Sequence, residues 1–467
     1  MSTHERRAEY CGAPAIRVCR VAALCTVALL GGAAATLATT AHTGSASGGG
    51  REFAYCTAAG VFRLYQYRVA QDGALRSLKP PYIGLSAVTR PPFAAPDHRS
   101  FYVPSKNAVL QYRIRPDGTL TPLDPATVPT GSLAGHVFAA DGRFLYVGDD
   151  ESAVIYQYAV HSGGALRPLA PPRVRTGHGA WCVGVILSPD GQTLYSLNGD
   201  CTIGQFRVGA NGRLSPLSPD AAPAAPSGQG IFAPDLVLGP GGHYAYAIAD
   251  LRNQPEGFAD HLLIVFRVCA DGTLESVSSR AAPPMGDLQV RGRTLFARLG
   301  LGRIDQYNIA ASGQLVPGLQ IHGPANGSAL VFTPRGRYAY QVGDAPGINR
   351  YRCAPDGSLT PLSQGPVVPT WGKPAGVYVD PSGRFLYAAT QNNWGPAGIG
   401  QFRIGKDGQL TPLIPPGVTM PFDNNLTIIR LPARPAPKPK GKVGAKPSAR
   451  SAAGPKRSAR KGVKKRR

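Results

Sequence analysis

The sequence is poor in charged residues, and acidic residues are the scarcest of them. Charged side chains make up 16% of the 467 residues, and 27 Asp and Glu stand against 50 Lys and Arg, for a net charge of +23. Residues 433–467 alone hold 14 Lys and Arg and no acidic residue. The basic character therefore belongs mainly to a tail and not to the body of the protein.

The central part of the chain lacks any sustained apolar pattern with a 3.6-residue period, which indicates little helix there. It is rich instead in Gly (58) and Pro (45), spread between short apolar runs. Placed in this way, these residues mark turns. A chain of this length often holds two or three domains, although all-β proteins of similar size can form one.

Familiar catalytic and metal-binding motifs are also missing. The chain has no His-Glu-x-x-His, no Gly-x-Ser-x-Gly and no phosphate-binding loop. No spacing of cysteine or histidine matches a zinc site, and no acidic loop has the spacing of a calcium site. No metal is therefore expected.

The eight cysteines do not form an obvious disulfide framework. Three lie in residues 1–50 and five in the body, so the body cannot pair all of its thiols internally. Cys182 and Cys201 flank one predicted hairpin and are the one pair for which we expect a disulfide.

The N-terminal region has the pattern of a targeting segment. Arginines precede an apolar run, Val21–Leu30, and small residues follow at Thr39–Ala41 and Gly44–Ala46. This order is typical of a secretory signal peptide. An uncleaved anchor is one alternative, because residues 21–38 just reach the length of a bilayer span; an apolar stretch without a targeting role is another. We expect residues 1–50 to be a leader or anchor with a short linker, and the protein to be secreted or membrane-anchored on the extracytoplasmic side.

One phrase recurs along the body of the chain. It reads QYRIRPDGTLTPL at 111–123, QFRVGANGRLSPL at 205–217 and QFRIGKDGQLTPL at 401–413. A second phrase, such as SPDGQTLYS at 188–196, precedes most copies. The glycine of the first phrase occurs eight times, 41–60 residues apart, at Gly73, Gly118, Gly164, Gly212, Gly272, Gly313, Gly357 and Gly408. Repeats of this period indicate a solenoid, a propeller or an array.

Each repeat predicts four short antiparallel strands joined by tight turns, which is typical of a propeller blade. The first repeat lacks its first strand, and a lone apolar strand, Asn425–Leu431, is left at the end. The two chain ends are therefore expected to share a blade and close the ring. The count predicts an all-β, eight-bladed β-propeller over residues 51–432. Seven blades are the alternative, because the repeat Met285–Gly318 matches poorly.

The blade phrases resemble those of the lactonase-type, 6-phosphogluconolactonase-like β-propeller family over roughly Glu52–Leu431. The resemblance implies a propeller, ordinarily of seven blades, that hydrolyses sugar-acid lactones without a required metal, so no cofactor is expected. Where the family has Arg-His after Gly-Pro, this chain has Pro234 and Asp235. Where the family has Asn-Glu, it has Ala249 and Asp250. The blade motifs match and the catalytic-type residues do not.

The two faces of the predicted propeller differ in sequence. Turns between first and second strands, and between third and fourth strands, lie on one face, which we call the turn face; here they are uniform and tight. The other connections form the loop face and are long and variable, as at 170–181, 249–261 and 390–398. Variable loops on a rigid frame are where binding sites usually lie.

Candidate ligand-binding residues map to this loop face. They are Trp181, Trp371, Trp394, Arg252 and Glu256. The tryptophans are predicted either to form a stacking platform for a carbohydrate or sugar-acid ligand, or to plug loops against the blades. The arginine is a candidate anion ligand.

A lactone hydrolase with a rearranged site would draw on other residues. The weak catalytic candidates are Asp235, Asp250, His136 and His178. The histidines lie on or next to predicted inner strands, where the alternative is an imidazole satisfied by the backbone. Acid–base catalysis needs two groups at a defined distance, which the sequence does not provide.

The C-terminal residues 433–467 contain no aromatic residue and almost no large apolar one, so they are expected to be disordered. The Lys and Arg of Lys438–Arg467 suit a polyanion, bound with release of counterions. In an exported protein this would be an anionic polymer or a membrane surface; in a cytoplasmic one it would be nucleic acid. A merely solubilising tail is the remaining alternative.

Three functions follow from these observations. The first is an exported or membrane-anchored, monomeric propeller that binds a ligand on its loop face. The second is a lactone hydrolase. The third is a nucleic-acid-associated scaffold.

Overall fold

A computed structural model describes the body of the chain. It covers residues 51–58, 61–86, 91–105, 107–138, 142–177, 179, 181–225, 235–250, 261–282, 285–299, 302–324, 327–328, 330–343, 347–363, 373–391, 397–421 and 424–431. The predicted leader and basic tail lie outside these residues. Within the described part of the chain, no helix has the length and apolarity needed to cross a membrane.

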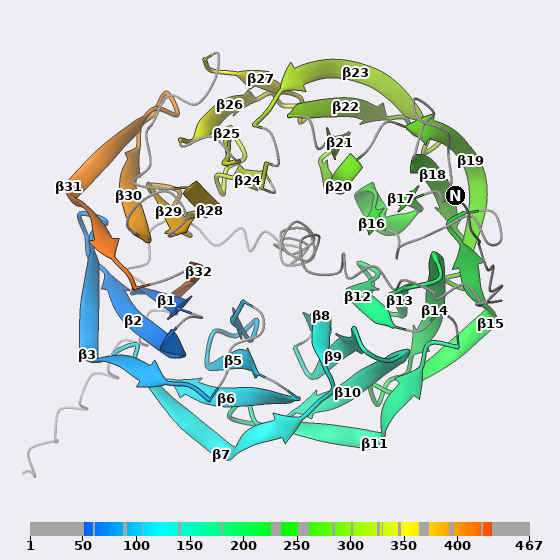
Figure 1. The fold of residues 1–467 in the computed structure, drawn as a ribbon. Helices are drawn as coiled ribbons and strands as arrows, with labels where there is room; N and C mark the ends of the chain where they lie inside the picture. The colour runs from blue at the N-terminus through cyan, green and yellow to red at the C-terminus, as the bar shows by residue number, and fades with distance from the viewer. Residues whose placement is uncertain are drawn as a thin grey trace, which may run out of the picture. The chain divides into compact units, whose positions relative to one another are not determined.

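The described strands form eight four-stranded antiparallel sheets arranged in a ring, which is a β-propeller (Figure 1). The count of eight is confirmed, and the seven-bladed alternative is wrong. The poorly matching repeat, Met285–Gly318, lies in a complete sheet. We number the blades 1 to 8 in chain order and the strands of each blade from the centre of the ring outward.

The strands of each blade are as follows. Blade 1 consists of β32 (Asn424–Arg430), β1 (Glu52–Ala58), β2 (Arg63–Val69) and β3 (Leu75–Gly84), and blade 2 of β4 (Phe93–Ala94), β5 (Ser100–Ser105), β6 (Ala108–Ile114) and β7 (Leu120–Pro129). Blade 3 consists of β8 (Leu133–Phe138), β9 (Phe144–Asp149), β10 (Val154–Val160) and β11 (Leu166–Arg175), and blade 4 of β12 (Cys182–Leu187), β13 (Thr193–Asn198), β14 (Thr202–Val208) and β15 (Leu214–Pro223).

The second half of the ring follows the same order. Blade 5 consists of β16 (Asp235–Leu238), β17 (Tyr244–Asp250), β18 (His261–Val268) and β19 (Leu274–Ala282), with the 3-10 turn η2 (Pro240–Gly242) after β16. Blade 6 consists of β20 (Met285–Arg291), β21 (Thr294–Leu299), β22 (Arg303–Ile309) and β23 (Leu315–His322). Blade 7 consists of β24 (Val331–Phe332), β25 (Tyr338–Gln341), β26 (Asn349–Cys353) and β27 (Leu359–Pro361), and blade 8 of β28 (Lys373–Val379), β29 (Phe385–Gln391), β30 (Gly398–Ile404) and β31 (Leu410–Thr419).

The two ends of the propeller meet in blade 1, which confirms the predicted closure. β32 pairs with β1 in antiparallel register from Glu52 opposite Arg430 to Ala58 opposite Asn424. The carboxylate of Glu52 accepts a hydrogen bond of 2.9 Å from Nε of Arg430 across this pair. Closure of the ring by main-chain hydrogen bonds removes the open sheet edge that a linear stack of blades would leave.

The recurring phrase joins each blade to the next through its glutamine. In β6, Nε2 of Gln111 donates to the carbonyl of Pro125 in the same blade at 3.0 Å, and its Oε1 accepts from the amide of Leu166 in blade 3 at 2.6 Å. The same two bonds are made by Gln66, Gln157, Gln205 and Gln401. A buried amide satisfied on both sides is a stable link. Val265 and Arg350 take this place in blades 5 and 7.

A second repeated contact joins the second strand of one blade to a turn of the next. The hydroxyl of Tyr102 donates to the carbonyl of Gly164 at 2.6 Å. The same bond, at 2.7–3.1 Å, is made by Tyr55, Tyr146, Tyr195, Tyr246, Tyr340 and Tyr387. Blade 6 has Phe296 at this position and so has no hydroxyl to donate.

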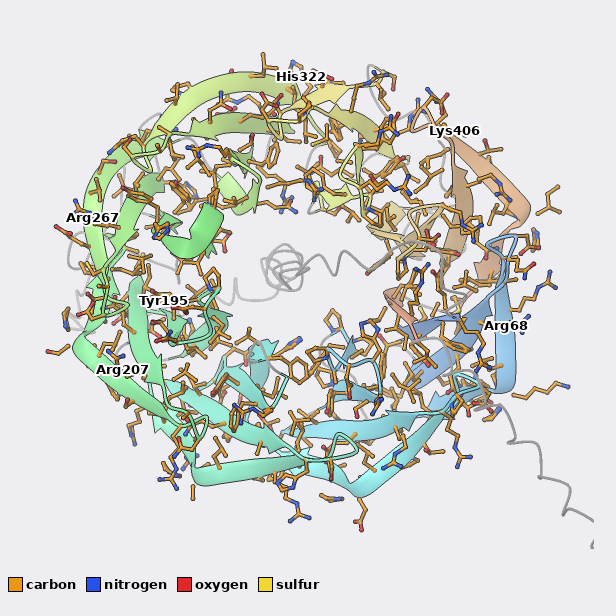
Figure 2. All side chains as sticks on the ribbon, turned by 180° about the vertical axis from the view of Figure 1, so that it is seen from behind. Arg68, Tyr195, Arg207, Arg267, His322 and Lys406 are labelled. Atoms are coloured by element: carbon orange, nitrogen blue, oxygen red, sulfur yellow. The ribbon has the colours of Figure 1, made fainter. Side chains whose placement is uncertain are left out.

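Exposed arginines occupy one position of the third strand in several blades. Arg68, Arg207 and Arg267 lie at separate points around the outer part of the ring (Figure 2). Nη2 of Arg207 reaches the carbonyl of Asp271 in the next blade at 3.4 Å. Because the side chains are exposed, contacts of this kind contribute little stability each.

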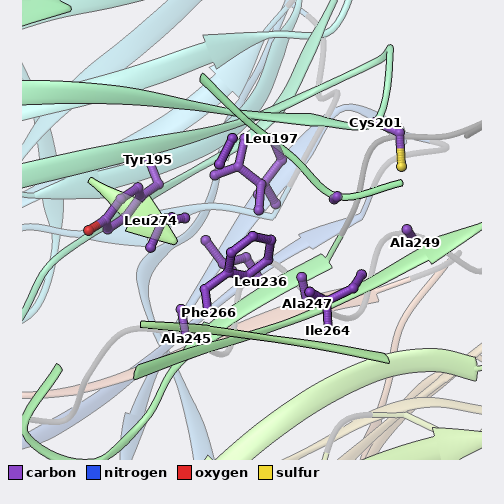
Figure 3. Close-up of a cluster of buried hydrophobic side chains, with 13 residues drawn as sticks. Tyr195, Leu197, Cys201, Leu236, Ala245, Ala247, Ala249, Ile264, Phe266 and Leu274 are labelled. Atoms are coloured by element: carbon purple, nitrogen blue, oxygen red, sulfur yellow. The ribbon is translucent and has the colours of Figure 1, made fainter. Parts of the chain in front are cut away.

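The hydrophobic core lies between neighbouring blades. In β17, Ala245, Ala247 and Ala249 belong to the cluster shared with blade 4, which Figure 3 shows. The alternate residues, Tyr246 and Ile248, belong to the cluster shared with blade 6. The second strand is thus buried on both faces, which is why it appears in the sequence as a nearly continuous apolar run.

The expected disulfide between Cys182 and Cys201 does not form, so that prediction is wrong. Cys182 packs in the cluster between blades 3 and 4, and its thiol donates to the carbonyl of Gly184 at 3.3 Å. Cys201 packs in the cluster between blades 4 and 5. The two side chains therefore lie on opposite faces of blade 4, and burial raises the pKa of Cys182 to about 12.

Candidate functional site

His136 lies on β8, the first strand of blade 3. Its imidazole stacks on the ring of Phe93 in blade 2, with the ring centroids 3.7 Å apart and 20° between the planes. Burial lowers the pKa of His136 to about 4, so the ring is neutral near pH 7. A base with so low a pKa is poorly matched to proton abstraction at that pH. The other histidine candidate, His178, lies outside the described residues.

Asp235 is the first residue of β16 in blade 5 and serves the frame. One carboxylate oxygen accepts from the amide of Leu236 at 2.9 Å, and the other accepts from the amide of Leu288 in blade 6 at 2.8 Å. Asp250 ends β17, and its side chain is outside the described part. Blade 4 separates the blades that carry His136 and Asp235, so the structure does not bring these two candidates together.

Trp181 is the one tryptophan candidate that the structure describes. Its indole lies directly on Gly199 in the next loop, where a Cβ would be 2.3 Å from Cε2 of the ring. Its carbonyl accepts from the amide of Gly199 at 3.0 Å, and 37% of the residue is exposed. Part of the ring therefore covers a loop and part faces solvent. The candidates outside the described residues are Trp371, Trp394, Arg252 and Glu256.

The acidic residues of the loop face that the structure describes are used within their own loops. Asp149 accepts from the amide of Glu151 at 2.9 Å and from the hydroxyl of Ser152 at 2.6 Å. Asp200 accepts from the amide and the hydroxyl of Thr202. Among the described residues, no group of three or more His, Cys, Asp or Glu could hold a metal ion.

The loop face holds a small pocket between blades 6 and 7, which the sequence did not indicate. Its volume is about 190 Å³. It is lined by Gln320, Ile321, His322, Asn349, Arg350, Tyr351, Pro361 and Ser363. These residues stand at the loop-face ends of β23, β26 and β27. Pockets for drug-sized ligands measure roughly 300–1,000 Å³, so this one suits a single small molecule.

The loop-face pocket forms where blade 7 is cut short. Its fourth strand, β27, has three residues, whereas β7 in blade 2 has ten. In blade 2 the amide of Gln111 holds the outer half of the fourth strand through Pro125. Arg350 replaces that glutamine in blade 7, and its Nη1 donates instead to Gln409 in blade 8. The phrase LTPL is intact at 359–362, so this arginine is the only sequence sign of the pocket that we find.

The lining of the loop-face pocket is polar but carries no Asp or Glu among its described residues. The hydroxyl of Ser363 is buried without a hydrogen-bond partner. Asn349 is 8% exposed, and the hydroxyl of Tyr351 donates to Gln341 at 3.3 Å. A buried hydroxyl without a partner costs free energy that a bound polar molecule could offset. The pocket therefore fits a hydroxyl-bearing ligand better than it fits acid–base chemistry.

Comparison with known proteins places the chain near other propellers. No family model matches the sequence, and no curated protein does so either. The solved structures that are similar include lactonase-type propellers, as the sequence resemblance predicted.

Three of these solved structures illustrate the range. A Bacteroides fragilis protein with a provisional 6-phosphogluconolactonase assignment is 17% identical, with a TM-score of 0.49, over 81% of this chain and 98% of that one. The periplasmic gluconolactonase of Pseudomonas aeruginosa is 19% identical, with a TM-score of 0.47, over 82% and 99%. The hydrazine synthase of Kuenenia stuttgartiensis is 17% identical, with a TM-score of 0.45, over 68% and 98%. None of these similarities assigns an activity to the chain.

Proposed function

We propose that this propeller binds a small hydroxyl-rich molecule, such as one sugar or sugar-acid unit, in the loop-face pocket. The observation that carries the proposal is the buried Ser363 hydroxyl, which has no partner and lines a pocket of about 190 Å³. The amides of Gln320 and Asn349 supply further donors and acceptors, and Tyr351 adds an aromatic surface. Sugar hydroxyls pair with groups of these kinds.

Lactone hydrolysis has less support from the described residues. Hydrolysis of a lactone needs a base that can activate water or a nucleophile near the working pH. His136 is stacked and neutral, with a pKa of about 4, and both carboxylate oxygens of Asp235 accept main-chain hydrogen bonds. We therefore place binding first and hydrolysis second.

Calorimetric titration of the full chain with glucose, galactose, gluconate and galactonate tests the binding proposal. We expect saturable binding of at least one of them, weakened several-fold by Ser363→Ala, because that change removes a donor and acceptor from the pocket. Ser312→Ala, in an exposed turn of blade 6, should leave the affinity unchanged. Saturable binding of none of the four compounds would contradict the proposal. Turnover of their lactones above background would favour the hydrolase instead.

We further propose that the propeller acts outside the cytoplasm and that Lys438–Arg467 holds it to an anionic polymer or membrane surface. The support is the sequence alone: a leader-like segment at residues 1–50 and a tail without acidic residues. N-terminal sequencing of the mature protein should show processing near Ala41 or Ala46. Deletion of residues 433–467 should abolish salt-sensitive binding to anionic vesicles, and retained binding would refute the role of the tail.

A further inference from the structure

Neighbouring blades touch on the turn face through the turns that join first and second strands. A proline of one turn packs against a glycine of the next. The pairs are Pro96 with Gly142, Pro189 with Gly242, and Pro334 with Gly383. A Cβ on these glycines would lie 3.7, 2.9 and 2.8 Å from the nearest proline carbon. These glycines have φ of +69°, +72° and +70°, a region that side-chain-bearing residues rarely adopt.

The turn of blade 6 does not make this contact with blade 5. In blade 4, the amide of Ser188 bonds the carbonyl of Thr193, so four residues form the turn. In blade 6, Arg291 pairs directly with Thr294, and only two residues form it. A Cβ on the glycine of this short turn, Gly292, would meet only a carbonyl of blade 7, at 3.8 Å. The proline of blade 5 is left facing space that a longer turn would fill.

A cavity of about 500 Å³ occupies this junction, and we call it the turn-face cavity. It is lined by Pro240, His243, Tyr244, Tyr246, Arg267, Val268, Arg293, Ile309, Ala310 and Ala311. Its volume falls within the roughly 300–1,000 Å³ of small-molecule sites. It lies on the face opposite the loop-face pocket and shares no residue with it.

The polar groups of the turn-face cavity are basic. Its lining holds Arg267, Arg293 and His243 and, among the described residues, no Asp or Glu. Nε and Nη2 of Arg293 donate to the carbonyl of Ile309 at 3.1 and 2.9 Å, which fixes the guanidinium plane. A guanidinium has five N–H donors, so three remain for a ligand.

The nearest printed counter-charge to this cavity is weakly held. Nη1 of Arg267 lies 3.6 Å from a carboxylate oxygen of Glu275, and the two side chains are 55% and 58% exposed. Ion pairs at such exposure contribute little. An anionic ligand could therefore compete for this arginine without disrupting the fold.

We propose that the turn-face cavity binds a small organic phosphate monoester. The two arginines can each present a fork of N–H groups to the phosphate oxygens, a geometry that favours phosphate and carboxylate. The imidazole of His243 adds a donor, and the convergence of three basic groups favours the more highly charged phosphate. The organic part would rest against Tyr244 and Val268. This site is separate from the sugar-binding site proposed above.

Calorimetric titration of the full chain with phenyl phosphate tests this proposal. Saturable binding is expected, and Arg267→Gln and Arg293→Gln should each weaken it at least tenfold. Ala311→Trp, which keeps every charge but fills the cavity, should abolish it. Because Arg293 also holds a main-chain carbonyl, the tryptophan variant keeps the test decisive if Arg293→Gln fails to fold.

Arg207→Gln is the matched control. Arg207 occupies in blade 4 the place that Arg267 has in blade 5, and it stands beside a complete turn contact, so its loss should leave the affinity unchanged (Figure 2). An equal loss with Arg207→Gln would show general surface electrostatics and overturn the site. Unchanged binding by Ala311→Trp would overturn it as well. Binding of inorganic phosphate with no gain from the phenyl group would overturn the ester as the ligand class.

Discussion

Tyr387 and Gly73 are 314 positions apart in the sequence, and the hydroxyl of Tyr387 donates a hydrogen bond of 2.7 Å to the carbonyl of Gly73. This bond joins blade 8 to blade 1. It has the same geometry as the tyrosine contact between Tyr102 and Gly164 inside the ring. The junction that closes the propeller is therefore built like the others, in addition to the strand that the two chain ends share.

Tyr387→Phe should lower the free energy of unfolding by about 1–3 kcal/mol, because the buried carbonyl of Gly73 would lose its donor. Urea denaturation followed by fluorescence measures the change. Tyr82→Phe is the control, since Tyr82 is 39% exposed and its hydroxyl can bond water; it should change stability by less than about 0.5 kcal/mol. Equal effects of the two changes would show that the closing bond adds nothing.

Gly118→Ala should destabilise the protein by more than about 2 kcal/mol. Gly118 has φ +89°, and a Cβ there would lie 2.0 Å from Cδ1 of the fully buried Phe53 in the neighbouring blade. Gly84→Ala is a matched control, because a Cβ at Gly84 meets nothing within 4 Å. We expect this second change to shift the thermal midpoint by little. A similar loss from both would mean that the blade junction does not require glycine.

Gln111→Leu should cost about 2–4 kcal/mol, because it leaves the amide of Leu166 and the carbonyl of Pro125 without partners. The comparison is Gln192→Leu, a change on an exposed turn residue. Chemical denaturation of both variants gives the difference. If the buried change were no more damaging than the exposed one, the glutamine would not be a structural link between blades.

The number of blades and the ring closure could be predicted because one residue type meets one fixed demand in every repeat. Gly118 and its equivalents must adopt a positive φ under an aromatic or hydroxyl side chain of the neighbouring blade, so they recur at a regular spacing. The lone strand Asn425–Leu431 predicted the shared blade, and β32 spans Asn424–Arg430. Local demands of this kind are visible in a single sequence.

The two pockets could not be predicted, because each depends on a neighbour that is distant in sequence. The short turn at Arg291–Thr294 is visible as a loss of two residues, but the cavity exists only because Pro240 of blade 5 faces it. The failed disulfide has a similar cause. Cys182 and Cys201 are close in sequence, yet each packs against a different neighbouring blade. Closeness along the chain does not tell which face of a blade a side chain occupies.

The buried ion pair at the closure predicts a pH dependence. The pKa of Glu52 is raised from 4.5 to about 7, first by burial and then by the charge of Asp380, while Arg430 opposes the rise. The folded protein therefore holds this proton more tightly than the unfolded chain does. The resulting contribution to the free energy of unfolding is fully present below about pH 4.5 and is lost as the pH rises through about 7.

Glu52→Gln should remove this dependence, because glutamine does not titrate. The stability of the natural protein minus that of the variant should fall by on the order of 3 kcal/mol between pH 4.5 and pH 8. Urea denaturation at half-unit pH intervals gives this difference. Aspartates with lowered pKa, such as Asp72 and Asp117, lose their contribution only as the pH falls, and they cancel because both proteins contain them. Glu275→Gln, an exposed change, should give a profile parallel to that of the natural protein, and a parallel profile for Glu52→Gln would mean that Glu52 stays charged in the closed ring.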